Sequence, residues 1–145
     1  MRLSRESAHE RFGAARVARL ATVSADGRPH IVPVVFALDG DVLYTAVDAK
    51  PKSTTALQRL ANIAAQPAVA VLVDHYADDW SQLWWVRADG TAAVIGGAEA
   101  DAALGLLTAR YAVYEQQPPP GPVVAVQVER WSGWAATDQG GATSS

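Results

Sequence analysis

The chain has 145 residues, of which 50% are apolar and 19% charged, a length and composition typical of one folded globular domain rather than a disordered chain. Its formal net charge of −3 argues against a main role in nucleic-acid binding, and the absence of cysteine excludes disulfides, thiolate metal sites and cysteine nucleophiles. No apolar run approaches the length of a membrane span and the first residues lack the apolar core of a signal peptide, so we expect no membrane span and a cytoplasmic location.

The first third of the chain predicts one helix followed by antiparallel strands. The helix covers residues 4–16 and is capped by Ser4 or by Ser7, because Ser7 and Glu10 have the spacing of a capping box. Strands are predicted over residues 17–24, 29–38 and 42–47, with hairpin turns at Asp26-Gly27 and Asp39-Gly40-Asp41. Three strands joined by two tight turns predict an antiparallel meander.

Helices and further strands alternate in the rest of the chain. A helix that ends before Pro67 is expected to bury the apolar residues that recur at helical spacing, namely Leu57, Leu60, Ile63 and Ala64. A second helix is expected over residues 99–114, and strands over residues 68–73, 82–95, 123–128 and 129–136. The continuous apolar run 68–73 predicts burial on both strand faces, and Ala88-Asp89-Gly90 predicts either a turn or a bulge.

These elements predict a single mainly β domain over residues 1–136, followed by a disordered tail over residues 137–145, which are small and polar. Strands outnumber helices and are linked by tight hairpins, which favours a barrel of six or seven antiparallel strands. Two or three helices are expected to cover it.

Motifs for self-contained catalysis are absent from the sequence. There is no G-x-G-x-x-G fingerprint, no phosphate-binding loop and no G-x-S-x-G elbow. His9-Glu10 begins like a zinc-binding H-E-x-x-H motif, but Gly13 stands where the second histidine belongs, and the acidic loop around Asp78-Asp79 is typical of a solvated segment. We therefore expect no metal site and a bound organic cofactor that carries the reaction.

The strongest local signal for a ligand is the segment Lys50-Pro51-Lys52-Ser53-Thr54, which contains the only lysines of the chain. It lies where a strand gives way to a helix, and the unpaired N–H groups of a helix start attract anions. Lys50, Lys52, Ser53 and Thr54 therefore predict a phosphate or carboxylate site, with Arg59 facing either the same anion or solvent. The alternative is an ordinary capped helix start with solvated lysines.

Five tryptophans form a second signal. Trp84 and Trp85 are adjacent in a strand, so their side chains face opposite sides of the sheet, and one of them needs a helix, a ligand or another subunit to cover it. Trp131 and Trp134 pose the same problem in the last strand. Such rings suit a subunit interface or a planar ligand, and the alternative is ordinary core packing.

Pro33 interrupts a Val/Ile-rich strand and cannot donate a ladder hydrogen bond, which indicates an edge or a bulge. Backbone groups near an edge proline are free to meet the rim of a heterocycle, or the proline protects the edge against aggregation. His30, on the same strand, is more typical of a surface histidine than of a catalytic base.

The order of these motifs resembles the pyridoxamine-phosphate-oxidase-like split-barrel superfamily, from about Glu6 to about Trp134. The resemblance lies in R-L-A-T-V-S-A-D-G-R-P-H-I-V-P-V, then K-P-K-S-T, then N-I-x-x-x-P, and then V-L-V-D-H-Y-x-D-D-W-S-x-L-W-W-V-R. Within the superfamily the chain is most similar to the F420-dependent oxidoreductases, for which the second and fourth motifs are the specific ones. The A-T-V-S-A-D-G-R-P turn is shared with flavin-binding relatives.

This resemblance implies an FMN-binding-like split barrel that forms a homodimer, with two cofactor sites in clefts between the subunits. The cofactor would be F420, or alternatively FMN, with its phosphate against Lys50, Lys52, Ser53 and Thr54. The strand around His30, Val32, Pro33 and Val34 would pass beside the ring, and Trp80, Ser81 and Trp85 would line the same cleft. Relatives place an arginine in the first turn of the helix where this chain has Thr55-Ala56, which implies either a weaker cofactor affinity or a larger share of the anion binding for the two lysines.

The implied chemistry is hydride transfer from the reduced deazaflavin to a small electron-poor acceptor of the enone, quinone or tetrapyrrole type. The protein would bind, orient and exclude water. His30, Tyr44 and His75 are candidate proton donors, and Arg5, Arg11 and Arg16 would offer a positive surface to the cofactor's acidic tail. A non-catalytic, cofactor-binding or purely dimeric protein is the alternative of a different class.

Overall fold

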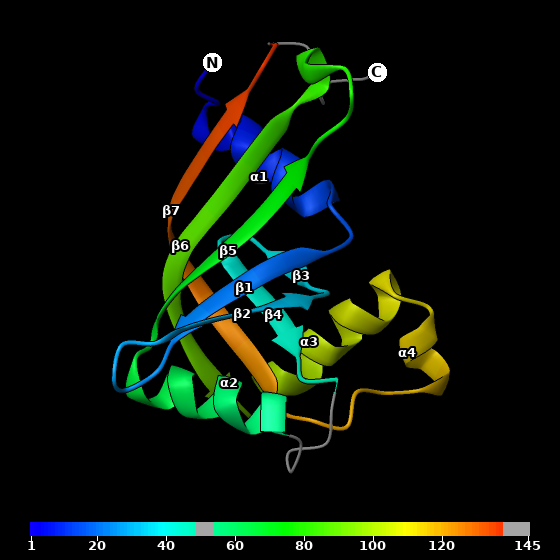
Figure 1. Ribbon diagram of the computed structural model, residues 1–145. Helices are drawn as coiled ribbons and strands as arrows, with labels where there is room; N and C mark the ends of the chain where they lie inside the picture. Colours follow the sequence, from blue (N-terminus) through cyan, green and yellow to red (C-terminus); the bar gives the residue numbers. More distant parts are fainter. Residues whose placement is uncertain (49–53, 138–145) are drawn as a thin grey trace.

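The computed structural model describes residues 1–48 and 54–137 of the chain, which form one seven-stranded antiparallel sheet with helices around it (Figure 1). The strands are β1 (Ala18–Val23), β2 (Pro29–Val34), β3 (Ala37–Asp39), β4 (Val42–Ala46), β5 (Ala68–His75), β6 (Trp84–Ile95) and β7 (Val123–Ala135). The helices are α1 (Arg5–Ala14), α2 (Thr54–Ala65), α3 (Gly97–Arg110) and α4 (Val113–Gln116), with a 3-10 turn η1 (Trp80–Gln82). The predicted mainly β architecture is confirmed.

The sheet curls into a barrel because its two edge strands are neighbours in the sequence. The strand order is β2-β1-β5-β6-β7-β4-β3, so β2 and β3 lie at opposite edges, yet only Val35 and Phe36 separate them. The Cα atoms of Val34 and Ala37 are therefore at most about 11 Å apart. A sheet whose edges meet at one point and diverge beyond it is a split barrel.

The predicted single strand over residues 29–38, and with it the meander, was wrong. Each tight turn makes its own hairpin, β1–β2 and β3–β4, but the two hairpins lie at opposite edges of the sheet. Pro33 lies on the edge strand β2, as its missing N–H predicted. Beyond it the carbonyl of Val35 accepts a hydrogen bond from the Thr45 hydroxyl, at 2.7 Å, instead of a ladder partner.

Tyr111 holds the backbone where the chain crosses between the two edges. Its hydroxyl accepts the N–H of Phe36 at 3.3 Å and lies 3.0 Å from the carbonyl oxygen of Phe36 and 2.9 Å from that of Arg16. Phe36 is fully buried, so water cannot replace these contacts. One phenol group therefore satisfies the buried polar groups of the crossing.

We expect Tyr111→Phe to lower the free energy of unfolding by about 1–3 kcal/mol, because buried backbone groups lose their partner while the ring stays in place. Urea unfolding followed by circular dichroism measures the change. Tyr76→Phe is the matched control, since Tyr76 is 64% exposed, and its effect should be near zero. Equal stability of the two variants would contradict the role of the Tyr111 hydroxyl.

Helix α1 closes the upper end of the barrel in Figure 1. Ser4 is its cap, accepting the N–H of Ser7 at 3.0 Å, so the Ser4 alternative is confirmed. Ala8 and Phe12 are fully buried, and the ring of Phe12 lies edge-on to Phe36 at 5.0 Å and to Trp131 at 5.2 Å. The helix thus closes this end with aromatic packing.

Helix α2 covers the opposite end with a different face from the one predicted. Ile63 is buried and Leu60 is half-buried, but Leu57 and Ala64 are exposed, whereas Ala56, Arg59 and Asn62 are buried. Asn62 donates to the Thr22 hydroxyl at 3.0 Å and accepts from Gln58 at 2.6 Å. Polar side chains face inward because strand β1 offers them a hydroxyl partner, which apolar spacing alone does not reveal.

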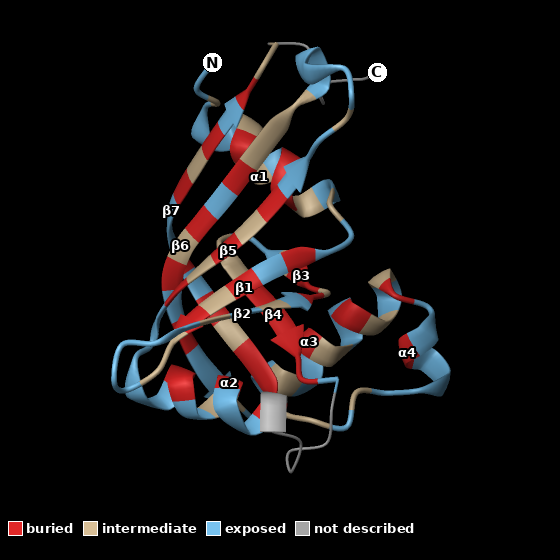
Figure 2. Ribbon diagram, viewed as in Figure 1, coloured by how far each residue is buried: buried red, intermediate tan, exposed pale blue. Residues whose placement is uncertain are grey.

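The structure settles four further predictions about strands and helices. β6 is one strand with a bulge between Asp89 and Gly90, where a Cβ on Gly90 would lie 2.3 Å from the carbonyl oxygen of Gln127. β7 is likewise one strand and not the predicted two, and the predicted helix over 99–114 is broken between α3 and α4. β5 is not buried on both faces, because Val69, Val71 and Val73 are buried whereas its other face is partly open (Figure 2).

No helix in the described ranges is long and apolar enough to cross a membrane. Residues 138–145, most of the predicted tail, lie outside the described residues.

Candidate functional site

One part of the barrel's outer surface has no covering helix. Helices α3 and α4 pack on the outer face of β3, β4 and the start of β7, where Tyr44, Ala103, Leu107 and Val123 form a second small core. On the outer face of β1, β2, β5 and β6 the outward side chains are half-buried or exposed, and Ile31 is 64% exposed (Figure 2). An exposed apolar surface of this kind marks a ligand or subunit contact.

A groove of about 420 Å³ lies on this uncovered face, and we call it the β1–β5–β6 groove. Its walls are mainly apolar, with Trp85 at one end and two arginines at the rim. The lining residues are Arg19, Ala21, Ile31, Ala70, Leu72, Asp74, Tyr76, Trp85 and Arg87. Its volume is within the range of small-molecule sites, and its apolar walls suit a planar ring.

The two adjacent tryptophans face opposite sides, as the strand alternation predicted. Trp84 packs against the barrel core, where it stacks on His75 at 6.4 Å and lies under the Arg11 guanidinium at 5.5 Å. Trp85 faces outward and lines the β1–β5–β6 groove. Trp131 is buried in the core, and Trp134 is exposed on the outer surface. Of the adjacent pair, Trp85 is therefore the ring that a ligand or a subunit would cover.

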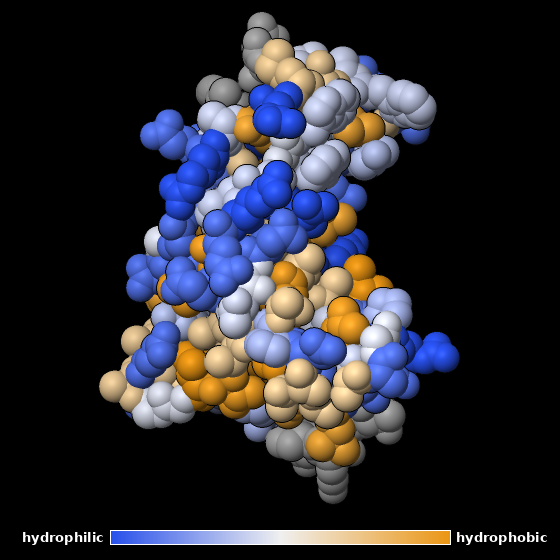
Figure 3. Space-filling model, turned by 90° about the vertical axis from the view of Figure 1, so that its left-hand side faces the viewer, coloured by the Kyte–Doolittle hydropathy of each residue, from blue (hydrophilic) through white to orange (hydrophobic). Residues whose placement is uncertain are grey.

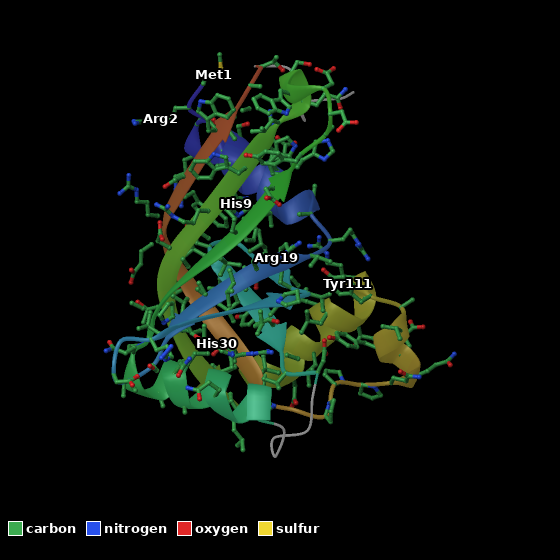
Figure 4. All side chains as sticks on the ribbon, in the orientation of Figure 1. Met1, Arg2, His9, Arg19, His30 and Tyr111 are labelled. Atoms are coloured by element: carbon green, nitrogen blue, oxygen red, sulfur yellow. The ribbon has the colours of Figure 1, made fainter. Side chains whose placement is uncertain are left out.

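The predicted site residues of strand β2 divide between its two faces. His30 and Val32 are half-buried and Val34 is buried on the side that faces the barrel interior, whereas Pro33 is exposed on the outside. His30 lies at the α2 end of the barrel (Figure 4), in a polar groove of about 320 Å³ that it lines with Gln58 and Asn62. Its Nδ1 is buried without a hydrogen-bond partner among the described residues.

Trp80 and Ser81 lie in η1, at the end of the barrel opposite to α2 (Figure 1). The Asp79 carboxylate accepts hydrogen bonds from the Ser81 N–H and hydroxyl, and these bonds lower the pKa of Asp79. Trp80 is largely exposed. A single chain therefore does not bring Trp80, Ser81 and Trp85 together with His30.

The predicted anion site falls mostly on residues that the structure does not describe. Lys50, Lys52 and Ser53 lie outside the described residues, and Thr54 is the first residue of α2. Arg59, on the second turn of α2, is only 9% exposed, and burial lowers its pKa although the nearby Asp48 carboxylate opposes that shift. Within the described residues its Nε has no hydrogen-bond partner. Arg59 thus faces the protein and not solvent.

Helix α1 does not provide the predicted basic surface. Arg5 pairs with Asp41 at 2.5 Å, Arg11 is buried, and the Arg16 guanidinium lies 4.6 Å from the centre of the Tyr111 ring. Arg11 lies over the Trp84 ring, and two of its guanidinium nitrogens have no hydrogen-bond partner among the described residues. The positive charge beside the uncovered face comes instead from Arg19, since Arg87 is paired with Asp89 at 3.1 Å.

Sequence reasoning missed several residues that line the groove, namely Arg19, Ile31, Ala70 and Leu72. Strand alternation places them opposite the core residues, and so could have identified them as outward-facing. It could not show that their face stays uncovered. Among the candidate proton donors, Tyr44 lies under α3, where its hydroxyl donates to Glu99 at 2.9 Å.

On the surface at the β6–β7 side, hydrophilic side chains gather around the middle and apolar ones toward the lower end (Figure 3).

No three metal-binding side chains come together anywhere in residues 1–48 or 54–137.

Solved structures share this fold over nearly their whole length. A FAD-binding protein from Mesorhizobium loti matches with a TM-score of 0.72 at 24% identity, over 92% of this chain and 95% of that one. A conserved hypothetical protein from Mycobacterium tuberculosis matches with a TM-score of 0.73 at 22% identity, over 98% and 95%. The heme storage protein HutZ from Vibrio cholerae matches with a TM-score of 0.70 at 18% identity, over 93% and 95%.

At these identities the likeness shows the fold alone, and it confirms the predicted split barrel. No curated protein sequence matches the chain. The family model described as pyridoxamine 5'-phosphate oxidase matches residues 5–135, which include every strand and helix of the structure. The chain belongs to the pyridoxamine 5'-phosphate oxidase family.

Proposed function

We propose that this protein binds a planar tricyclic redox cofactor, F420, and passes a hydride from it to a small electron-poor acceptor. The observation that carries the proposal is the β1–β5–β6 groove, an uncovered apolar surface on a barrel of this family. The motifs K-P-K-S-T and D-D-W-S-x-L-W-W-V-R favour F420 over other tricycles. FMN is the second candidate, favoured by the likeness to a FAD-binding protein of the same fold.

The residues present fit such a cofactor at its ring end. Trp85 offers an outward aromatic face, and Ile31 and Leu72 add apolar area on which a ring can lie. Arg19 places positive charge in the groove, where the polar edge or anionic arm of the cofactor would leave it, whereas the charge of Arg87 is compensated by Asp89.

The residues also fit its anionic end. A buried guanidinium without a partner is costly, because its N–H donors have given up water without replacement. Arg59 meets that description at Nε within the described residues, and it follows shortly after Lys50 and Lys52 in the chain. A phosphate at the start of α2 would supply the missing acceptor and would use the helix N-terminus.

We propose that the protein is a homodimer, because the start of β6, which carries Trp85, lies at the far end of the barrel from α2 (Figure 1). Along β6, Trp85 is seven residues from Ala92, whose N–H donates at 2.8 Å to Pro67, just after the C-terminal end of α2. Seven strand residues span about 23 Å, so within one chain Trp85 lies far from this end of α2. Two copies packed antiparallel through their uncovered faces would bring Trp85 of one copy beside α2 of the other.

When bound, the reduced deazaflavin supplies the hydride, two electrons and one proton delivered to one atom of the acceptor's double bond. The chain's own residues would exclude water through Ile31, Leu72 and Trp85 and hold the acceptor in line. A second proton must reach the other atom of that bond. His30, with its Nδ1 unpartnered among the described residues, is the candidate that we favour.

Titration of the purified protein with F420, FMN and heme tests the cofactor. We expect a micromolar Kd for F420, measured by the change in deazaflavin fluorescence, and weaker binding of FMN and heme. Reduced F420 should then be oxidised in the presence of at least one member of a panel of enones, quinones and tetrapyrroles. Tight binding of FMN or heme alone would reject F420, and binding without turnover would favour the non-catalytic alternative.

Ile31→Glu tests the site and the dimer together. A carboxylate on the uncovered face should give a monomer in sedimentation and weaken F420 binding by at least about tenfold, because it buries a charge in an apolar contact. Val113→Glu is the matched control, since Val113 is 59% exposed on α4, away from this face. If Ile31→Glu remained dimeric with normal affinity, the cofactor cleft would lie elsewhere.

A further inference from the structure

The paired outer side chains of β6 and β7 form two regular rows. The register places Trp85 opposite Trp134, Arg87 opposite Ser132, and Asp89 opposite Arg130. Paired residues project to the same side of a sheet, and each second residue of a strand returns to that side. Two tryptophans therefore stand next to a run of polar and charged groups.

These rows border a groove of about 420 Å³, which we call the β6–β7 groove. The N-terminal residues run beside β7, where the Leu3 N–H donates to the Gly133 carbonyl at 3.0 Å, and they add Arg2 to the rim. Arg2 lies beside the upper end of β7 in Figure 4. The groove thus combines three arginines with three tryptophans, of which Trp85 and Trp134 face outward.

Two of its arginines carry uncompensated charge. Arg87 lies 3.1 Å from the Asp89 carboxylate, which neutralises that pair. Arg2 and Arg130 have no carboxylate partner in the described part of the chain. The groove therefore carries a local excess of positive charge on a chain whose net charge is −3, and it attracts anions.

The remaining groups of the groove favour a flat ligand with polar substituents. Trp134 is 40% exposed and Trp85 is half-buried, so both rings offer apolar area to a ligand. The Ser132 hydroxyl, between Trp134 and Arg130 along β7, is buried and has no hydrogen-bond partner among the described residues. A ligand acceptor at the floor would satisfy it.

We propose that the β6–β7 groove binds planar aromatic molecules that carry carboxylates. The rings lie against Trp85 and Trp134, and the carboxylates meet Arg2 and Arg130 in bidentate, charge-assisted hydrogen bonds. Trp85 and Arg87 line both this groove and the β1–β5–β6 groove, so a ligand here adjoins the cofactor surface. That a ligand bound in this groove is the hydride acceptor rests on the proposed function. That the groove binds such a ligand does not depend on it.

A single-stranded nucleic acid would also use arginine and tryptophan. The paired rows extend over only five residues of β6, about 13 Å, and the chain as a whole is acidic. A short aromatic carboxylate matches this length and charge better than a polyanion does.

Isothermal titration of the cofactor-free, full-length protein tests the groove, with naphthalene-2,6-dicarboxylate as the probe and its uncharged diamide as the matched ligand. We expect the dicarboxylate to bind and the diamide to bind at least about tenfold more weakly. Arg2→Gln and Arg130→Gln should each weaken the dicarboxylate by about tenfold. Arg28→Gln removes the same charge from the β1–β2 turn and should leave the affinity unchanged.

Equal binding of diacid and diamide, no effect of Arg2→Gln and Arg130→Gln, or a preference for a single-stranded oligonucleotide over the dicarboxylate would each overturn the proposal. Failure of the proposed function gives a different pattern, because the dicarboxylate would still bind in an arginine-dependent way while no F420 bound. Acceptance of a carboxylated enone by the F420-loaded enzyme, with a KM raised in Arg130→Gln and kcat retained, would place the acceptor in this groove.

Discussion

Replacing Lys50 and Lys52 together with alanine is expected to raise the Kd for F420 by about 100-fold or more. Each lysine that meets a phosphate contributes a charge-assisted hydrogen bond, of about 1.5–3 kcal/mol, and the chain contains no other lysine to substitute for them. Arg59 would remain but cannot supply both contacts. Fluorescence titration with F420 measures the change, and FMN should lose affinity in the same variant.

The double replacement with arginine is the matched control, because it keeps both charges in the same segment and should retain most of the affinity. Circular dichroism should show the same fold for both double variants. An unchanged Kd in the alanine variant would mean that the anion lies elsewhere, and the start of α2 would then be an ordinary helix start. The two lysines would in that case be solvated, as the alternative interpretation of the sequence holds.

Phe36→Ala is expected to lower the free energy of unfolding by about 3–5 kcal/mol, the largest stability effect that we predict. Phe36 is fully buried, its ring lies 5.0 Å from that of Phe12, and the Arg110 guanidinium lies 4.8 Å from its centre. It also belongs to the two-residue crossing between β2 and β3. Its removal leaves a cavity where the barrel edges meet, so the backbone cannot collapse to fill it without opening the barrel.

Chemical unfolding in urea measures this loss, with Val113→Ala as an exposed control expected to change stability by less than about 0.5 kcal/mol. A loss below about 1 kcal/mol for Phe36→Ala would contradict the packing at the crossing. Cofactor affinity in the surviving folded fraction provides a second readout. It should stay normal, because Phe36 faces the core and lines neither groove.

The two grooves lie on one outer surface and suit two different ligands. Trp85 and Arg87 belong to both, and β6 carries them. The β1–β5–β6 groove is mainly apolar, which suits a ring and a subunit contact, whereas the β6–β7 groove is rich in arginine, which suits an anionic acceptor. Residues of one strand would thus bring the two reactants side by side.

Local elements of the fold followed from the residues themselves. The hairpin turns at Asp26-Gly27 and Asp39-Gly40-Asp41 form where they were predicted, and Gly27 and Gly40 adopt positive φ angles of 87° and 60°. The opposite orientation of Trp84 and Trp85 also followed, because successive side chains of a strand must alternate. These features depend on bond geometry and on neighbours within a few residues, which the sequence contains in full.

What the sequence could not determine was which strand pairs with which and which faces are covered. The apolar residues over 29–38 predict one strand. In the barrel this run is interrupted at Val35-Phe36, and β2 and β3 lie at opposite edges of the sheet. Helical spacing predicted that Leu57 is buried. In the structure Asn62 is buried instead, because it donates a hydrogen bond to the Thr22 hydroxyl, and Leu57 is exposed. In both cases the deciding partner lies far away in the chain.

The candidate site divides in the same way. The sequence by itself determined the chemical types involved, a lysine pair before a helix and a tryptophan that must face outward from its strand. Only the tertiary structure decided that Arg19, Ile31 and Leu72 share a groove with Trp85, and that Arg2, Arg87 and Arg130 share another. Periodicity reports how a strand divides its side chains between two faces, but the packing of α3 and α4 elsewhere is what leaves this face uncovered.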